Sequence, residues 1–134
     1  MLNAKEKRII NKIAHNIFLK NNIFCRIYLK NSIGDEDIAE RGFNLLSSTK
    51  YREYNLQTIF YLSIEEKKLM ILESNDLKDL LDNQTHQKAI NTTAALLKDE
   101  NISTAIIFWL KNIKNITSQT KIIKIPTQFI YEDN

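Results

Sequence analysis

Two apolar runs near the middle of the chain predict a β-hairpin. Ile59–Ile64 and Leu69–Leu72 are separated by a short charged link, Glu65–Lys68. Runs of this length that are rich in Ile, Phe and Tyr and joined by a polar link favour paired strands. Neither run alternates cleanly with polar residues, so we expect both faces of the hairpin to be covered.

Upstream of the hairpin, apolar residues at helical spacing predict two helices with a strand between them. The first helix runs from Asn3 to Asn21, with Asn3 as N-cap and Glu6 placed for a capping box. A strand follows over residues 23–29. The second helix should carry its apolar face on Ile38, Ala39, Phe43, Leu45 and Leu46.

Downstream of the hairpin, the pattern predicts three more helices. The first is short and lies around Leu77–Leu81, and the second covers residues 85–98 with Thr85 as its N-cap. The third begins near residue 101 or 103, and its segment 105–110 is apolar nearly all round. Such a helix is typical of a buried core element, and its apolar part is too short to span a membrane.

The order of these elements predicts an α/β fold. The first strand, a helical crossover and the second strand should form a parallel unit, to which the hairpin adds an antiparallel strand. We therefore expect a three-layer α/β/α sandwich with a small mixed sheet of about three or four strands and about five helices. One domain should cover the whole chain, with a core over 1–120 and an extended tail over 121–134, where loose alternation also allows an edge strand.

Composition narrows the class of protein without revealing its chemistry. The chain has 134 residues, of which 43% are hydrophobic and 26% charged, as in an ordinary globular domain. Its single cysteine, Cys25, excludes an internal disulfide and is expected to be a small buried hydrophobe. Neither a leader pattern nor a membrane-length apolar run is present, which predicts a cytoplasmic protein, although a trimmed leader would leave the same sequence.

Charge is unevenly distributed along the chain. Residues 1–30 hold seven basic residues and one acidic residue, whereas residues 31–100 hold eight basic and thirteen acidic residues. A nucleic-acid contact is open to the basic first helix, whose candidates are Lys5, Lys7, Arg8 and Lys12. Because the centre of the chain is acidic and no concentrated basic stripe is present, we do not expect nucleic acid as the partner.

Two acidic loops are the candidate metal site. Asp35 and Asp37 follow the first strand, and Glu73 and Asp76 follow the third. If the loops converge, their carboxylates suit a hard divalent cation such as calcium. An antiparallel third strand would separate them, and the first loop would then face Glu65–Glu66 at the hairpin tip. Helix capping is the alternative role for the acids near Asp37.

The sequence contains none of the common catalytic templates. Gly-x-Ser-x-Gly, His-Glu-x-x-His, Cys-x-x-Cys, P-loop and EF-hand spacings are all absent. His15 is expected at the surface or half-buried, and His86 at the surface. With two such histidines and one buried cysteine, the chain has few candidates for nucleophilic catalysis. An enzyme is therefore less favoured than a binding protein. If the protein is an enzyme, we expect a metal-dependent phosphatase that uses the same acidic loops.

From the first helix through Trp109 the chain resembles the TPM domain family, small α/β/α sandwiches of bacteria and plastids. The similarity rests on the order and apolarity of the elements, on Gly34-Asp35 before the second helix, and on the paired strands 58–64 and 68–72. Residues 125–134 are also similar to the C-terminal extension of some members.

The resemblance implies a mixed sheet between helices and, in some members, calcium at an acidic patch, phosphatase activity, or a role in assembly or repair of larger complexes. This chain departs from the family pattern at Ser74, where the resemblance implies an Asp that is a metal ligand. Many members also carry a leader and a membrane anchor, and we expect neither here. We therefore expect a TPM-like accessory or binding domain that acts through contacts with an unidentified protein partner. A weak calcium site would use Asp35, Asp37, Glu73 and Asp76.

Overall fold

A three-stranded mixed sheet forms the centre of the molecule. The computed structural model describes residues 2–99 and 101–124, with side chains up to Asn115. Strand β1 (Phe24–Lys30) pairs in parallel with β2 (Gln57–Ser63), which pairs antiparallel with β3 (Lys68–Glu73). The predicted hairpin and the predicted parallel unit are both confirmed.

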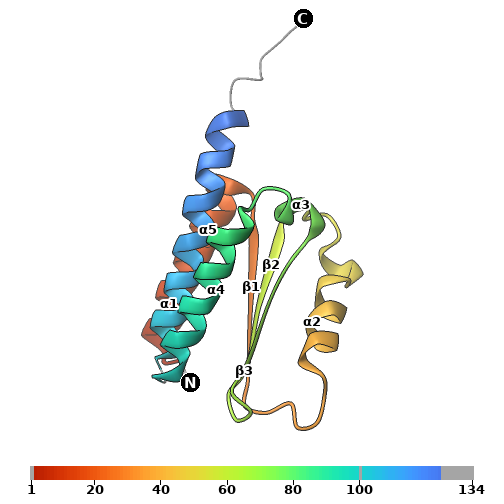
Figure 1. Ribbon diagram of the computed structural model, residues 1–134, viewed down its shortest axis with the longest axis vertical. Helices are drawn as coiled ribbons and strands as arrows, with labels where there is room; N and C mark the ends of the chain where they lie inside the picture. The colour runs from red at the N-terminus through yellow and green to blue at the C-terminus, as the bar shows by residue number, and fades with distance from the viewer. Residues whose placement is uncertain (1, 100, 125–134) are drawn as a thin grey trace, which may run out of the picture.

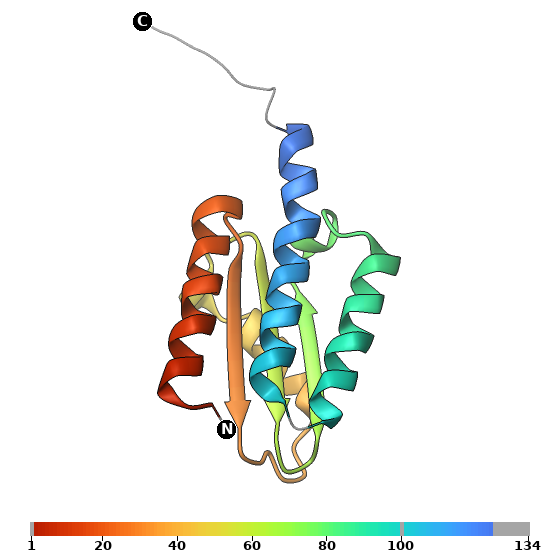
Figure 2. The ribbon, with the colours of Figure 1, turned by 90° about the vertical axis from the view of Figure 1, so that its left-hand side faces the viewer.

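Helices cover both faces of the sheet, as the sequence predicted (Figure 1). Helix α1 (Ala4–Asn21), α4 (Asn83–Lys98) and α5 (Ile102–Lys124) form one layer, and α2 (Ile38–Leu46) lies on the opposite face. Helix α3 (Asn75–Lys78) is a single turn at the end of β3. Figure 2 shows the first layer from the front, with α5 lying between α1 and α4.

The core is divided between the two faces of β2. All seven residues of this strand are buried, because its side chains alternate between the two helical layers. Phe60 and Leu62 pack with residues of α1 and α5, including Trp109, whereas Ile59 and Tyr61 pack under α2. The expectation of a hairpin covered on both faces therefore holds for β2, while β3 is mostly half-buried.

The first helix begins where the sequence predicted. The Asn3 side chain accepts a hydrogen bond from the Glu6 backbone at 2.8 Å, and the Glu6 carboxylate accepts one from the Asn3 backbone at 2.9 Å. At the other end Asn22 adopts the left-handed conformation that ends many helices.

Two predicted boundaries are wrong. Helix α4 begins at Asn83 with Asp82 as N-cap, and Thr85 instead donates to the Asp82 carboxylate through its backbone N–H and its hydroxyl. Residues 121–124, predicted as tail, belong to α5, and the rest of the predicted tail, 125–134, lies outside the described residues.

Phe43 was predicted on the buried face of α2 but is 63% exposed. The sheet-facing position is Gly42, where an added Cβ would lie 3.0 Å from Cδ1 of Leu72. The missing side chain lets α2 approach β3 closely, and Phe43, one residue further round the helix, turns outward.

Candidate functional site

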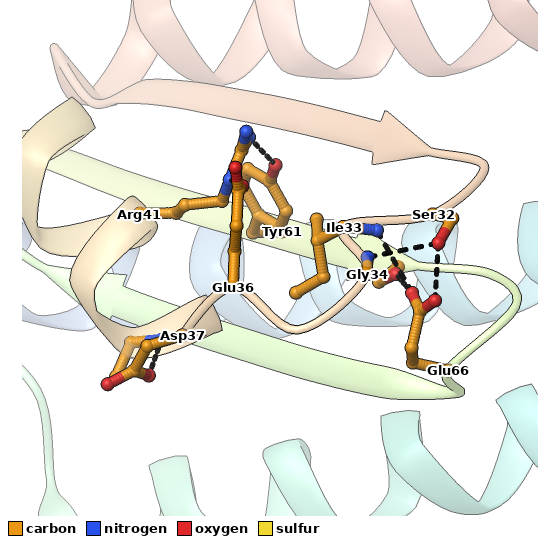
Figure 3. Close-up of polar contacts among 10 residues, drawn as sticks. Ser32, Ile33, Gly34, Glu36, Asp37, Arg41, Tyr61 and Glu66 are labelled. Atoms are coloured by element: carbon orange, nitrogen blue, oxygen red, sulfur yellow. Dashed lines mark hydrogen bonds and ion pairs between the residues drawn. The ribbon is translucent and has the colours of Figure 1, made fainter.

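The tip of the hairpin is tied to the loop after β1 by one carboxylate (Figure 3). Glu66 accepts hydrogen bonds from the Ser32 and Ser63 hydroxyls and, at 3.0 Å, from the backbone N–H of Ile33. These bonds, first those from Ser32 and Ser63, lower the pKa of Glu66 to about 2. The expectation that the first acidic loop would face the hairpin tip is therefore confirmed.

The loop itself is shaped by Gly34. Its φ of +60° lies in the left-handed region that glycine adopts without steric cost, and its N–H donates to the Ser32 hydroxyl at 3.0 Å. Beyond it the chain reaches Asp37, whose carboxylate accepts from the Ala39 N–H at 2.9 Å and caps α2. The capping role proposed for this acidic loop is confirmed at Asp37.

Replacing Glu66 with glutamine should remove a pH-dependent part of the stability. The folded pKa of about 2 lies below the ordinary value of 4.5, so the ionised Glu66 stabilises the fold above pH 4.5. That contribution is lost as the pH falls from 4.5 toward 2. Urea denaturation of wild type and Glu66→Gln should therefore differ at neutral pH and converge in acid. The exposed neighbour Glu65→Gln is the control, and a pH-independent difference would contradict the assignment.

An open groove of about 780 Å³ lies between α2 and β1, beside this loop. Its lining residues come from the end of β1, from the loop before α2, from α2 and from β2; they include Tyr28, Leu29, Lys30, Glu36, Asp37, Glu40, Arg41, Asn44 and Tyr61. Tyr28 and Tyr61 are register partners on adjacent strands, and their rings stack with centroids 5.9 Å apart. The groove therefore has an aromatic floor and charged walls.

Arg41 connects α2 to the floor of this groove. Its Nη1 donates to the Tyr61 hydroxyl at 2.8 Å, and its Nε forms an ion pair with Glu36 (Figure 3). The hydrogen bond from Arg41, together with its charge, lowers the pKa of Glu36. Glu36 thus stays ionised and fixes the guanidinium beside Tyr61.

A second arginine, Arg26, lies almost completely buried beside Tyr28, with 5% of its surface exposed. Its Nε and Nη2 donate to the Tyr28 hydroxyl at 3.1 and 2.6 Å. Its Nη1 donates at 3.0 Å to the carbonyl of Leu45 and to Oε1 of Gln57. The guanidinium also lies 4.3 Å from the ring centroid of Tyr51 in the short 3₁₀ helix Thr49–Tyr51.

Sequence reasoning missed these arginines and tyrosines. A usable signal was present, because Arg26, Tyr28 and Lys30 alternate with Cys25, Ile27 and Leu29 along β1. The alternation places the polar side chains on the α2 face and the apolar ones on the core face.

The four predicted metal ligands are not brought together. Asp35 and Asp37 are exposed at the carboxyl end of β1. Glu73 pairs with Thr58 at the beginning of β2, so Glu73 and Asp76 lie at the opposite end of the sheet. Within residues 2–99 and 101–124, no group of three or more His, Cys, Asp and Glu side chains could hold a metal ion. The four residues therefore do not form one shared site, and calcium binding stays a prediction.

Glu73 instead faces a histidine. Its Oε2 lies 2.9 Å from Nε2 of His86, and both residues are only 9% exposed. The prediction of a surface His86 is wrong because α4 begins earlier than expected and turns this residue inward. Ser74, at the position of the expected metal ligand, accepts from the Gln57 N–H at 3.0 Å and donates to the Asn55 carbonyl at 2.8 Å.

Other predicted features lie where the sequence placed them. His15 is exposed and Cys25 is buried, and burial raises the pKa of the Cys25 thiol to about 12. The basic candidates of α1 are exposed; they are Lys5, Lys7, Arg8 and Lys12. Their contact with nucleic acid stays a prediction. Over the described ranges, no helix is both long and apolar enough to cross a membrane.

Comparison with protein families matches the TPM domain over residues 1–116. The chain belongs to the TPM domain family. This TPM domain is also similar in structure to the BA42 protein of the psychrophilic bacterium Bizionia argentinensis, known from an NMR structure. The TM-score is 0.79 at 14% identity, over 89% of this chain and 83% of that one, which establishes a shared fold. No curated protein matches the sequence.

Proposed function

We propose that this TPM domain is a binding module whose groove between β1 and α2 receives an extended segment of a partner protein. The observation that carries the proposal is the position of the groove beside an edge strand of the sheet. An exposed strand edge can accept a further strand through main-chain hydrogen bonds, while a neighbouring groove selects side chains.

The backbone of β1 has donors and acceptors to offer along that edge. The N–H of Phe24 donates to the carbonyl of Leu56, and the carbonyl of Lys30 accepts from Ile64, both at 2.9 Å. Since peptide groups alternate in direction along a strand, those of Cys25, Ile27 and Leu29 point away from β2. No strand in the described part of the chain pairs with this side of β1.

The groove continues to this edge. Leu29 lines it, although the Leu29 side chain packs with the core on the opposite face of the sheet. The backbone of β1 therefore borders the groove directly. A bound segment could pair with β1 and place a side chain over the half-buried ring of Tyr28, which stacks on the buried ring of Tyr61.

Selection from a library of random displayed peptides, followed by a blocking substitution, tests this proposal. Asn44→Trp places an indole in the groove from an exposed position of α2, and Asn91→Trp places the same group on an exposed position of α4 as the matched control. Selected peptides should bind wild type and Asn91→Trp equally, and Asn44→Trp about tenfold or more weakly, as expected when an anchoring pocket is filled. In wild type, the bound peptide should slow amide exchange at Cys25, Ile27 and Leu29.

Two results would contradict the proposal. Peptides that bind Asn44→Trp as tightly as wild type would place the interaction outside the groove. Failure to enrich any peptide that is sensitive to the substitution would argue against a segment-binding groove.

A further inference from the structure

The two tyrosines on the floor of the groove have hydroxyl protons to donate. The Tyr28 hydroxyl accepts from both Nε and Nη2 of Arg26, at 3.1 and 2.6 Å, which occupies both of its lone pairs. The Tyr61 hydroxyl accepts from Nη1 of Arg41 at 2.8 Å. Neither hydroxyl donates to an acceptor among the residues whose side chains are described, so their protons remain for a ligand in the groove. Tyr28 is half-buried, and Tyr61, although only 2% exposed, still lines the groove.

Positive charge lies behind these hydroxyls. The two ion pairs of the described residues, Arg41 with Glu36 and His86 with Glu73, do not include Arg26. The Arg26 guanidinium is thus buried with neutral hydrogen-bond partners, and two of its N–H groups polarise the Tyr28 hydroxyl. Lys30 adds an exposed ammonium group to the lining of the groove. A polarised phenol beside buried positive charge favours an acceptor that carries negative charge.

We infer that the Tyr28 and Tyr61 hydroxyls form a subsite for a carboxylate carried by the bound segment. The inference rests on the proposed segment-binding function. The register places Tyr28 opposite Tyr61, and the near-parallel stacking of their rings, at 21°, brings two donors to one side of the groove. A carboxylate has two oxygens and can accept from both.

The walls of the groove favour a monoanion over a dianionic phosphate. Glu36, Asp37 and Glu40 line the same groove as the two cations Lys30 and Arg41. Repulsion by these carboxylates grows with the charge of the ligand, so a single negative charge is tolerated better than two. The chemistry is shared by an acidic side chain and by a C-terminal carboxylate, and the test separates these two sources.

Titration of the whole chain with small probes, followed by NMR, tests the subsite. N-acetyl-alanine carries a C-terminal carboxylate, N-acetyl-glutamic acid α-amide carries a side-chain carboxylate, and N-acetyl-alanine amide is the neutral control. Saturable shifts of the Arg26 and Arg41 Nε–H signals are expected with at least one carboxylate and not with the amide. The probe that binds more tightly identifies the source, and either result supports the subsite.

Substitutions of the phenols provide the second arm. Tyr28→Phe and Tyr61→Phe each remove one donor and should weaken carboxylate binding about tenfold or more, the usual effect of losing a hydrogen bond to a charged group. Tyr54→Phe is the matched control, because Tyr54 lies outside the groove and packs on Phe18 and Phe24. Thermal melting of each variant shows that it is folded at the temperature of the titration.

Three outcomes would overturn the inference: unchanged affinity in both phenylalanine variants, tighter binding of inorganic phosphate than of either carboxylate, and shifts confined to residues outside the groove. Failure of this inference is distinguishable from failure of the proposed function. Peptides that depend on the groove but are indifferent to Tyr28→Phe would overturn the carboxylate subsite alone. Absence of any groove-dependent peptide would overturn the proposed function.

Discussion

Truncation of Trp109 to alanine should lower the free energy of unfolding by about 3–5 kcal/mol. The Trp109 side chain is 0% exposed and lies in the core between α5 and the sheet, with its ring centroid 5.1 Å from that of Phe60. Removing it leaves a cavity that rigid neighbours on β2 and α1 can fill only in part. Domains of this size are stable by about 5–15 kcal/mol, so the variant should be close to unfolding. Urea denaturation followed by circular dichroism measures the difference.

Two controls separate cavity formation from other effects of the substitution. Trp109→Phe keeps an aromatic ring and removes an indole N–H that is buried without a hydrogen-bond partner among the described residues, so its cost should stay below about 1.5 kcal/mol. Phe43→Ala removes a ring that is 63% exposed and should change stability by no more than about 0.5 kcal/mol. A loss at Trp109→Ala no larger than that at Phe43→Ala would contradict the assignment of this core.

The fold could be predicted from the sequence because its strongest signals are local. The length and composition of the runs around Phe60 and Ile71 indicated a hairpin, and the positions of Asn3 and Glu6 indicated a helix start. The parallel pairing of β1 with β2 then followed from the helix between them. Each of these steps depends on neighbouring residues or on a general rule of chain connection.

The candidate site was harder to predict because it depends on which loops lie at the same end of the sheet. The acidic residues were visible in the sequence, but the antiparallel hairpin places Glu73 at the end of the sheet opposite Asp37. The prediction that His86 lies at the surface failed for a related reason. The N-cap of α4 is Asp82 and not Thr85, and this difference changes which residues at the start of the helix face inward. The alternation along β1 indicates which face Arg26 lies on, but its hydrogen bond to Gln57, which is far away in sequence, leaves no local signal.

Gly42 shows a different limit of predicting the buried face of a helix from its apolar residues. A glycine contributes nothing to an apolar stripe, yet here it marks the side of α2 that packs against Met70 and Leu72. Counting apolar residues instead drew attention to Phe43, which is exposed. Close approach of two backbones is a property of the packed structure, and the sequence alone offers only the small residue that permits it.

Replacement of Arg26 by methionine should lower the free energy of unfolding by about 2–4 kcal/mol. It leaves the buried Oε1 of Gln57 without its donor and removes one donor from the Leu45 carbonyl, which keeps the Ser48 N–H at 3.3 Å. Methionine fills much of the volume of the arginine stem, but it offers nothing to the Leu45 carbonyl or to Oε1 of Gln57, which accept from Nη1 of Arg26. Relief of the cost of burying a charge opposes this loss. That relief is small here, because guanidinium is weakly hydrated and Arg26 also lies over the ring of Tyr51.

Two further variants show whether the lost hydrogen bonds or the relief of the buried charge has the larger effect on stability. Arg26→Lys keeps the charge but not the planar set of donors, so it should also be destabilising, whereas Arg8→Met on the exposed surface of α1 should be nearly neutral. Urea denaturation at neutral pH measures all three. If Arg26→Met were as stable as wild type or more stable, the free-energy cost of burying the Arg26 charge would be at least as large as the stabilisation from its hydrogen bonds. In that case Arg26 would be retained for what it does at Tyr28, and the effect of the substitution would appear in carboxylate binding instead of stability.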